Sequence, residues 1–511
     1  MSGVPRHVLL VAFSFLLVLL RFSSDGGGAT TCSGFVVPYS SGSGRGAPTA
    51  HQRATRKVHQ YRTRAAFRRL QVMPLAPRAQ KAAVEGAQRV GSSLGAGLSG
   101  KEAVDQAGER LIPLFAEVDA HTKRTLRRVL DTFREFRVGS NVFAGVDGYG
   151  HGDIGRETLD KVYARLFGAE AALVRVQCFS GTHAIACALF GVLRPGDTML
   201  ACSGRPYDTL DEVIGTRIPM NDEYADASDP LPEGLIGNLK EFHVSYTEAR
   251  WAERGLVVFV DNCYGEFVEE REPCHVGADL IAGSLIKNPG GTIAKSGGYV
   301  AGKRRLVRAA ANRLGAPGVA GGATLGQNQN LFQGLFLAPT IVGESLKGAI
   351  LLAEVFGGTF GLPTNPPPPP PPVVDDTAAD VNGDARGATA AAAGGGGSVG
   401  AELGGGGAGG RTDIVQALEL GDRDRLIKFC EAVQLFSPVN AYVRPVPGVT
   451  PGYGDEVIFA DGTFVDGSTL ELSSDGPLRP PYIVFAQGCT HWTHWALIIE
   501  QALLAMGLVE E

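Results

Sequence analysis

The eight cysteines of this 511-residue chain include no Cys-x-x-Cys pair. Zinc sites and dithiol redox motifs use closely spaced cysteines, so both kinds of site are disfavoured. Five of the cysteines lie among apolar neighbours in predicted strands or helices, namely Cys178, Cys187, Cys202, Cys263 and Cys430. Buried thiols in a reducing compartment are therefore expected, rather than a disulfide framework.

Acidic residues are scarce in the first 92 positions, which contain 2 of them against 13 Lys and Arg. The remainder contains 51 acidic residues against 34 basic ones, which disfavours a nucleic-acid partner for the folded part. No metal site is predicted either. Asp375, Asp376 and Asp380 fall in a tract rich in Pro, Gly and Ala, where solvated charges are the simpler explanation.

The N-terminus has no apolar run of membrane-spanning length. Residues 8–20 form a short apolar stretch after Arg6, which predicts a signal peptide at residues 1–21 and no stable membrane span in the mature protein. Residues 22–92 are rich in Ser, Ala, Gly and Arg, the composition of a transit peptide. The two in series resemble the bipartite presequence of algae with complex plastids, with Phe35 in the cleavage region. A plastid location is expected, with the secretory pathway as the alternative.

The glycine-dense segment 148–157 is no Rossmann fingerprint, because no long apolar strand precedes it and its glycines are wrongly spaced. A loop that reaches a neighbouring active site suits it better. Beyond residue 140 the pattern alternates between strands and helices, and the near-continuous apolar strands predict a mostly parallel α/β sheet buried on both faces. Strands are expected at 171–176, 198–202, 256–262, 279–284 and 297–302, and helices near 156–167, 182–193 and 330–355.

The composition also predicts domain boundaries. N-terminal helices at 93–140 lead into a large domain at 141–345, and a smaller C-terminal α/β domain follows at 346–511. A run of prolines and an Ala and Gly tract predict a disordered insertion at 363–410. After it we expect a helix from 411 to 435, turn-rich strands that include 456–460, and a final helix near 494–506.

Two reactive residues follow apolar strands. Lys287 ends a strand in Gly-Ser-Leu-Ile-Lys-Asn-Pro-Gly-Gly, and Asp261 ends a strand in front of Asn-Cys-Tyr-Gly-Glu. A lysine in apolar surroundings is a candidate for imine formation with an aldehyde cofactor, and a neighbouring aspartate could keep the cofactor's ring nitrogen protonated. Lys295 and Lys303 are the competing lysines, but their contexts suggest a flexible turn and a basic surface cluster.

A phosphate cradle is expected where Ser180, Gly181 and Thr182 join a strand to an amphipathic helix, because free amides and the helix dipole attract an anion there. An ordinary N-cap formed by Ser180 or Thr182 is an equally good explanation of the motif alone. Ser284 could add a hydroxyl to the same phosphate. Tyr207, after the next strand, could stack on a pyridine ring, although a turn tyrosine exposed to solvent is the simpler alternative.

Together these motifs resemble the aluminium-resistance or methionine gamma-lyase-like family of pyridoxal phosphate enzymes, which is similar to the cystathionine lyases of fold-type I. The resemblance covers about 141–361 and 411–494. It rests on the segments at 148–157, 180–185, 206–210 and 283–291, and on Glu-Leu-Ser-Ser-Asp-Gly-Pro-Leu-Arg at 471–479.

The resemblance implies that Lys287 binds pyridoxal 5'-phosphate covalently, that Asp261 pairs with the ring nitrogen and that Tyr207 stacks on the ring. Gly181, Thr182 and Ser284 would then hold the phosphate, with Ser180 beside them.

The resemblance also implies a homodimer or homotetramer, in which Tyr149 completes the site of the partner subunit. His151 stands near the place of an arginine that the cystathionine lyases use there, which puts the phosphate contact across the subunits in question. Arg479 is the first choice for binding the substrate carboxylate, and Arg444 is its competitor.

The expected reaction is carbon–sulfur bond cleavage in methionine, cystathionine or a related amino acid, which gives a 2-oxo acid, ammonia and a thiol. Other reactions of the same cofactor are alternatives, because the same lysine and aspartate serve several of them. A cofactor-binding protein with a stress or metal-tolerance role and no turnover is a further alternative.

Overall fold

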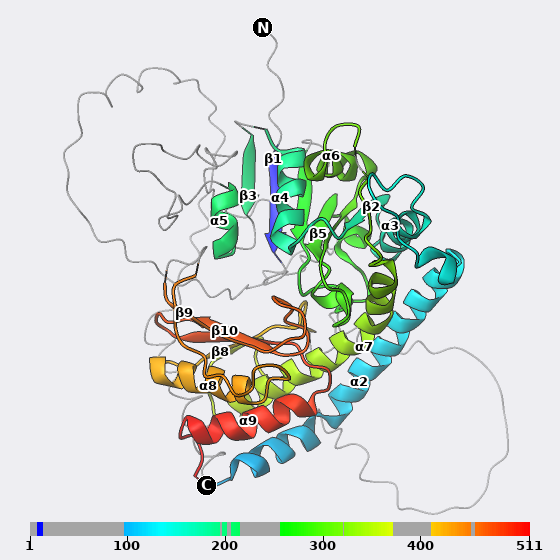
Figure 1. Ribbon diagram of the computed structural model, residues 1–511. Helices are drawn as coiled ribbons and strands as arrows, with labels where there is room; N and C mark the ends of the chain where they lie inside the picture. Colours follow the sequence, from blue (N-terminus) through cyan, green and yellow to red (C-terminus); the bar gives the residue numbers. More distant parts are fainter. Residues whose placement is uncertain are drawn as a thin grey trace, which may run out of the picture. The chain divides into compact units, whose positions relative to one another are not determined.

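Two β-sheets form the framework of the chain in the computed structural model (Figure 1). In the part of the chain that the structure describes, the larger sheet has six strands in the order β2-β6-β5-β4-β1-β3, and the smaller has five in the order β7-β8-β11-β10-β9. Both sheets belong to one unit of the chain. The described residues are 8–13, 97–194, 197–201, 206–214, 256–319, 321–370, 410–450 and 455–510.

The large sheet is mostly parallel, as the sequence predicts. Its strands are β1 (Val8–Phe13), β2 (Ala171–Arg175), β3 (Thr198–Ala201), β4 (Val257–Asp261), β5 (Leu280–Ser284) and β6 (Gly298–Gly302). β3, β1, β4 and β5 pair in parallel, and β6 is antiparallel to β5 and β2. Because β4 and β5 are parallel neighbours, their carboxyl ends meet at one edge of the sheet.

Strand β1 lies inside this sheet and pairs with both β3 and β4, with Phe13 opposite Asp261. Its residues belong to the run that the sequence assigns to a signal peptide. Removal of residues 1–21 would therefore take away a strand that pairs with the strand carrying Asp261. The transit-peptide-like segment at 22–92 lies outside the described residues, so the presequence stays a prediction.

Both faces of the large sheet are buried, in agreement with its apolar sequence. Phe259 and Leu280 join a hydrophobic cluster with α4 (Gly181–Val192) and α6 (Arg304–Leu314). Val260 and Ile281, the next residue in each strand, join a second cluster with α3 (Ile154–Leu166) and α7 (Asn328–Leu352). Successive side chains in a strand point to opposite faces, so alternate positions fill the two clusters.

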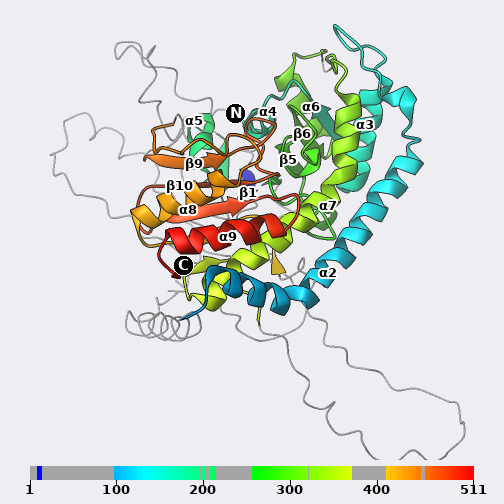
Figure 2. The ribbon, with the colours of Figure 1, turned by 60° about the horizontal axis from the view of Figure 1, so that its bottom comes forward.

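The N-terminal helical region is one helix, α2 (Gly100–Glu135), rather than several. Its start is fixed by a capping box in which Ser99 accepts from the Glu102 amide and Glu102 accepts from the Ser99 amide. Pro113 lies within it, and the apolar spacing of buried residues continues on both sides. Figure 2 shows α2 running beside α7, the helix against which it packs.

Helix α7 continues into the π-helix η8 (Ala353–Thr359). The segment Asn328–Thr359 is long and apolar enough to cross a membrane, but 72% of its most apolar window is buried inside the protein. Its hydrophobicity is therefore that of a core helix. The expected domain boundary at residue 345 falls inside this continuous helix.

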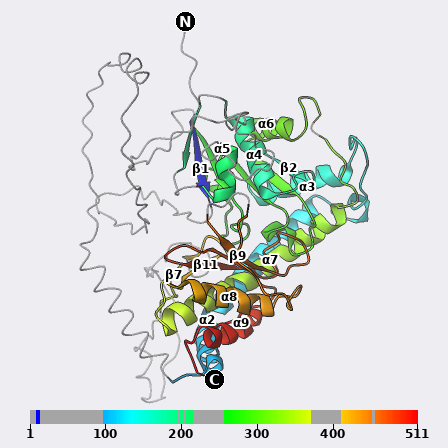
Figure 3. The same ribbon diagram turned by 60° about the vertical axis from the view of Figure 1, so that its left-hand side comes forward.

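The small sheet is entirely antiparallel. Its strands are β7 (Thr364–Asn365), β8 (Gln416–Glu419), β9 (Val457–Asp461), β10 (Ser473–Pro477) and β11 (Ile483–Gln487), and its helices are α8 (Arg423–Leu435) and α9 (Thr493–Ala505). Figure 3 shows both helices on the side of this sheet away from the large sheet. The sequence predicts a helix from residue 411 onward. In the structure strand β8, which pairs with β11, comes before helix α8 along the chain. Shorter helices are η3 (Ser140–Val142), η4 (Asp208–Leu210), α5 (Asp211–Ile214), η6 (Pro273–Val276) and η7 (Asn288–Gly290).

The first residues of the expected insertion are part of the fold. Strand β7 pairs with β8, and the Glu419 amide donates to the Pro363 carbonyl at 2.9 Å. The Gln416 side chain donates to the Pro366 carbonyl at 3.0 Å. Proline composition alone could not reveal this pairing, because the partners lie about fifty positions further along the chain. Residues 371–409 lie outside the described residues.

Candidate functional site

The site forms where β4 and β5 end. Asp261 is the last residue of β4, and it is in register with Ala282 of β5. Ser284 closes β5, and Lys287 follows it at the start of the short helix η7. The parallel pairing therefore brings Asp261, Ser284 and Lys287 to the same edge of the sheet, as the sequence predicts.

The Lys287 ammonium lies over an aromatic ring. Its Nζ is 4.0 Å from the centroid of the Tyr264 ring, a cation–π contact. Burial lowers the pKa of Lys287, but its contact with Tyr264 and the charge of Asp261 raise it more, so the pKa lies above its ordinary value. The Lys287 amine is therefore held in its protonated form beside Tyr264 and Asp261.

Asp261 is a buried carboxylate, with 5% of its surface exposed. One of its oxygens accepts a hydrogen bond from the Cys263 amide at 3.1 Å. Burial raises the pKa of Asp261, while that hydrogen bond and the charge of Lys287 act to lower it. A carboxylate in this position gains from a cationic partner, which a protonated ring nitrogen would provide.

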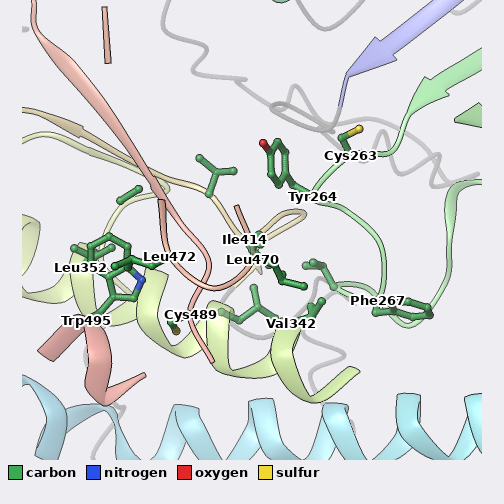
Figure 4. Packing of buried hydrophobic residues seen from close by; sticks show 14 of the residues in the cluster. Cys263, Tyr264, Phe267, Val342, Leu352, Ile414, Leu470, Leu472, Cys489 and Trp495 are labelled. Carbon is green, nitrogen blue, oxygen red and sulfur yellow. The ribbon is translucent and has the colours of Figure 1, made fainter. Parts of the chain in front are cut away.

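Tyr264 and Cys263 belong to the site although the sequence assigned them no role there. Figure 4 shows both on the segment that follows β4. Tyr264 has a positive φ of 71°, a left-handed conformation that turns the chain beside Lys287. Burial, together with the charge of Asp261, raises the pKa of Cys263 well above its ordinary value, so this thiol is neutral. Both residues lie in the Asp-Asn-Cys-Tyr-Gly-Glu segment that the sequence analysis singled out for Asp261.

A buried hydrogen-bond network holds the segments that carry the two reactive residues, each of which is followed by an asparagine. Asn262 donates to Glu272 at 3.2 Å and to the Tyr299 hydroxyl at 3.3 Å. Tyr299 donates to Glu266 at 2.9 Å, and Asn288 donates to the Glu266 carbonyl at 3.1 Å. Burial raises the pKa of Glu266 well above its ordinary value, which favours a neutral carboxyl in this network. The network fixes both segments relative to each other.

The N-terminus of α4 points its first turn at the same edge. Ser180 is the N-cap, and its hydroxyl accepts from the His183 amide at 3.0 Å. The amides of Gly181 and Thr182 have no acceptor within the helix, since the first turn of any helix leaves its donors unpaired. A Cβ at Gly181 would lie 3.0 Å from Cβ of Ser284 and 3.3 Å from the Cys263 sulfur. Glycine thus keeps open the space between the helix and β5.

Tyr207 lies beside this turn. Its hydroxyl is 3.0 Å from that of Thr182, which joins the segment after β3 to the start of α4. Burial raises the pKa of Tyr207, and the charge of Asp261 adds to this effect. The aromatic ring, the helix N-terminus and the carboxylate therefore lie at one site.

These residues fit a phosphate-bearing aldehyde cofactor. Gly181 leaves room for the backbone to approach an anion, and the hydroxyls of Thr182 and Ser284 come from the two elements that flank this room. Lys287 would supply the amine, and Asp261 would supply the acceptor for a ring proton. The start of α4 and Ser284 thus offer a phosphate both hydrogen-bond donors and the positive end of a helix dipole. An ordinary N-cap would not need the additional hydroxyl of Ser284.

Gly181→Ala should weaken cofactor binding by at least tenfold, about 1.4 kcal/mol, because the added methyl group lies against Ser284 and Cys263 in the phosphate cradle. The cofactor dissociation constant can be measured by absorbance titration of the cofactor-free protein. Gly448→Ala is the matched control, since a Cβ there has open space within 4 Å. Equal affinities for the two variants would show that no phosphate sits at this turn.

Three predicted site residues are not brought to this cluster. Tyr149 is 68% exposed, on a loop whose backbone bonds to Gly322. Arg479 pairs with Asp455 at 2.5 Å and Arg444 with Glu431 at 2.6 Å, and both arginine side chains are more than half exposed. Within the described part of the chain, no hydrogen bond, ion pair or ring contact joins any of the three to Lys287.

The sequence analysis did not single out Asp475 of β10, although the charge of Lys287 reaches it. Burial raises the pKa of Asp475 to about 6, and the charge of Lys287 acts to lower it, so the two groups interact. Asp475 lies in the 471–479 segment on which the family resemblance partly rests. The motif indicated that this segment matters, but only the strand pairing of the small sheet shows toward which face the Asp475 side chain points.

The chain is similar to known proteins over most of its length. The family model for methionine gamma-lyase matches residues 100–255, 239–371 and 400–507. The uncharacterized protein YnbB of Bacillus subtilis is 41% identical over 422 residues, which cover 75% of this chain and 90% of the relative.

Two solved structures are also similar. A carbon–sulfur lyase involved in aluminium resistance from Clostridium novyi is 32% identical, with a TM-score of 0.63, and the match covers 85% of this chain and 100% of that one. A candidate cystathionine beta-lyase involved in aluminium resistance from Clostridium acetobutylicum is also 32% identical, with a TM-score of 0.64 and the same coverage. The chain therefore belongs to the methionine gamma-lyase family, in agreement with the resemblance that its sequence motifs predict.

Proposed function

We propose that this protein uses pyridoxal 5'-phosphate to cleave the carbon–sulfur bond of a sulfur amino acid such as methionine or cystathionine, which gives a 2-oxo acid, ammonia and a thiol. The observation that carries the proposal is the meeting of Lys287, Asp261 and the α4 N-terminus at one edge of the sheet. The family and the names of its solved relatives support this reaction class.

The residues of the site have separate roles in this proposal. Lys287 holds the cofactor covalently, and Gly181, Thr182 and Ser284 hold its phosphate. Tyr207 lies against the ring, and Asp261 accepts the hydrogen bond of the ring nitrogen. When bound, the cofactor supplies a ring that withdraws electrons from the substrate carbon.

The chain's own residues then move the protons. The Lys287 amine, once it is free of the cofactor, would remove a proton from the substrate as a general base. Tyr264, whose ring lies 4.0 Å from Nζ, limits the positions that this amine can take. Arg479 remains our choice for the substrate carboxylate, with Arg444 as competitor, and either must first leave its exposed ion pair.

Borohydride trapping followed by peptide mapping tests the covalent link. Reduction should fix the cofactor on the peptide that contains Lys287, whereas a label on Lys295 or Lys303 would overturn the assignment. Release of 2-oxo acid and thiol from methionine, cystathionine and cysteine tests the reaction. A trapped cofactor with no release from any of these would favour another cofactor reaction or a role without turnover.

We also propose a homodimer or homotetramer, in which the exposed Tyr149 reaches the site of a neighbouring subunit. Sedimentation analysis should give at least twice the mass of the chain. A plastid location, with the secretory pathway as alternative, is likewise proposed from the N-terminal composition. N-terminal sequencing of the protein from its cell of origin would show whether β1 is retained.

A further inference from the structure

The small sheet turns one face toward the large sheet. Ser474 and Gly476 of β10 face the helices, because the Ser474 hydroxyl lies 3.6 Å from the Cys430 sulfur and a Cβ at Gly476 would lie 3.1 Å from Leu426, both on α8. Asp475 lies between them, so its side chain points to the other face. Figure 1 shows that α8 and α9 lie beyond the small sheet, on the side away from the large one.

Aromatic residues flank Asp475 on both sides. It is in register with Phe459 of β9 and with Phe485 of β11, and directly opposed residues in antiparallel strands share a face. Phe459 lies on the edge strand β9 and is 37% exposed. A carboxylate set between two aromatic rings is a surface suited to an organic cation.

The segment that leads into β10 lies near Lys287. The segment before β10 touches the residue before Lys287, since a Cβ at Gly467 would lie 3.6 Å from the end of Ile286. The charge of Lys287 also influences Asp475. Within the described residues, Asp475 has no hydrogen bond or ion pair through its side chain. In the proposed function the Lys287 nitrogen is tied to the cofactor, so it is not free to pair with this carboxylate.

We propose that Asp475, between Phe459 and Phe485, binds a positively charged group at the far end of the substrate's side chain. The inference rests on the proposed function and narrows its substrate class. It favours sulfur amino acids whose sulfur substituent ends in an ammonium group over those that end in a methyl group, such as methionine. The carboxylate supplies the charge, and the two rings favour an organic cation over a hydrated metal ion.

A pair of ligands of equal size tests this inference. S-(2-aminoethyl)-L-cysteine and S-propyl-L-cysteine differ only in whether the substituent ends in an ammonium or a methyl group. Binding is measured by calorimetry on borohydride-reduced holoprotein, in which the cofactor stays linked and turnover is blocked. The wild type should bind the aminoethyl compound at least tenfold more tightly, about the effect of one partly buried charge pair.

Asp475→Asn should reduce that preference to about twofold or less, because the amide keeps the shape and loses the charge. The matched control is Asp424→Asn, which makes the same change of net charge at an exposed position on α8, and it should keep the preference. An unchanged preference in Asp475→Asn would overturn the inference, as would a wild type that binds both ligands equally. Because binding is measured without turnover, a protein that fails to release thiol can still show the preference, so the two failures are distinguishable.

Discussion

Lys287→Ala should lose the yellow absorbance of lysine-bound cofactor and reduce 2-oxo acid release by at least about a thousandfold. The reason is that one amine performs two tasks, since it holds the cofactor and removes the substrate proton. Among the described residues, Lys287 lies over the Tyr264 ring near the ends of β4 and β5, whereas Lys295, later in the same loop, is exposed to solvent. Absorbance spectra and a coupled keto-acid assay measure both effects.

Lys295→Ala is the matched control, because this exposed lysine lies only eight positions further along the same loop. It should keep the absorbance and the activity. A Lys287→Ala protein that remained yellow and trapped cofactor on reduction would refute the covalent role. Restoration of part of the activity by a small added amine would support the general-base role specifically.

Much of the large sheet could be predicted, because its strands are apolar runs of the expected length, bounded by turns. The predicted strands at 171–176, 256–262 and 297–302 agree with β2, β4 and β6 to within about a residue at each end. Features set by distant partners were not predictable in this way. The pairing of β7 with β8 joins segments on the two sides of a long tract, and the insertion of β1 between β3 and β4 requires a partner nearly two hundred residues away.

In the site, too, some residues could be predicted from the local sequence and others depend on distant partners. Asp261, Ser284 and Lys287 could be predicted together because parallel neighbouring strands end at one edge, a consequence of topology alone. Asp475 enters from a different sheet, and its direction depends on which face of β10 packs against α8. Arg479 shares its motif but lies in the turn before β11, where it pairs with Asp455. A motif thus marks a segment as important without showing which of its side chains faces the site.

Asp261→Asn should lower activity without lowering the stability of the protein. Burial raises the pKa of this carboxyl above its unfolded value, so the ionised form costs the folded protein stability at neutral pH, and that cost disappears as the pH falls and the group is protonated. Asparagine has nearly the same shape, and its oxygen can still accept from the Cys263 amide. The cofactor-free Asp261→Asn protein should therefore unfold at a temperature equal to or above that of the wild type at pH 7.

The same substitution should lower 2-oxo acid release by about a hundredfold or more, because a neutral amide cannot hold the ring nitrogen in its protonated state as charge develops there. Cofactor content, measured after release in alkali, should fall much less. Asp279→Asn is the contrasting variant. Asp279 lies at the opposite end of the same strands, where it accepts from the Val258 amide at 2.7 Å and pairs with Lys303, so its loss should lower the unfolding temperature and leave activity per folded molecule unchanged. If Asp261→Asn behaved like Asp279→Asn, with lower stability and full activity, Asp261 would be a structural residue, and the ring nitrogen would have to find its partner elsewhere.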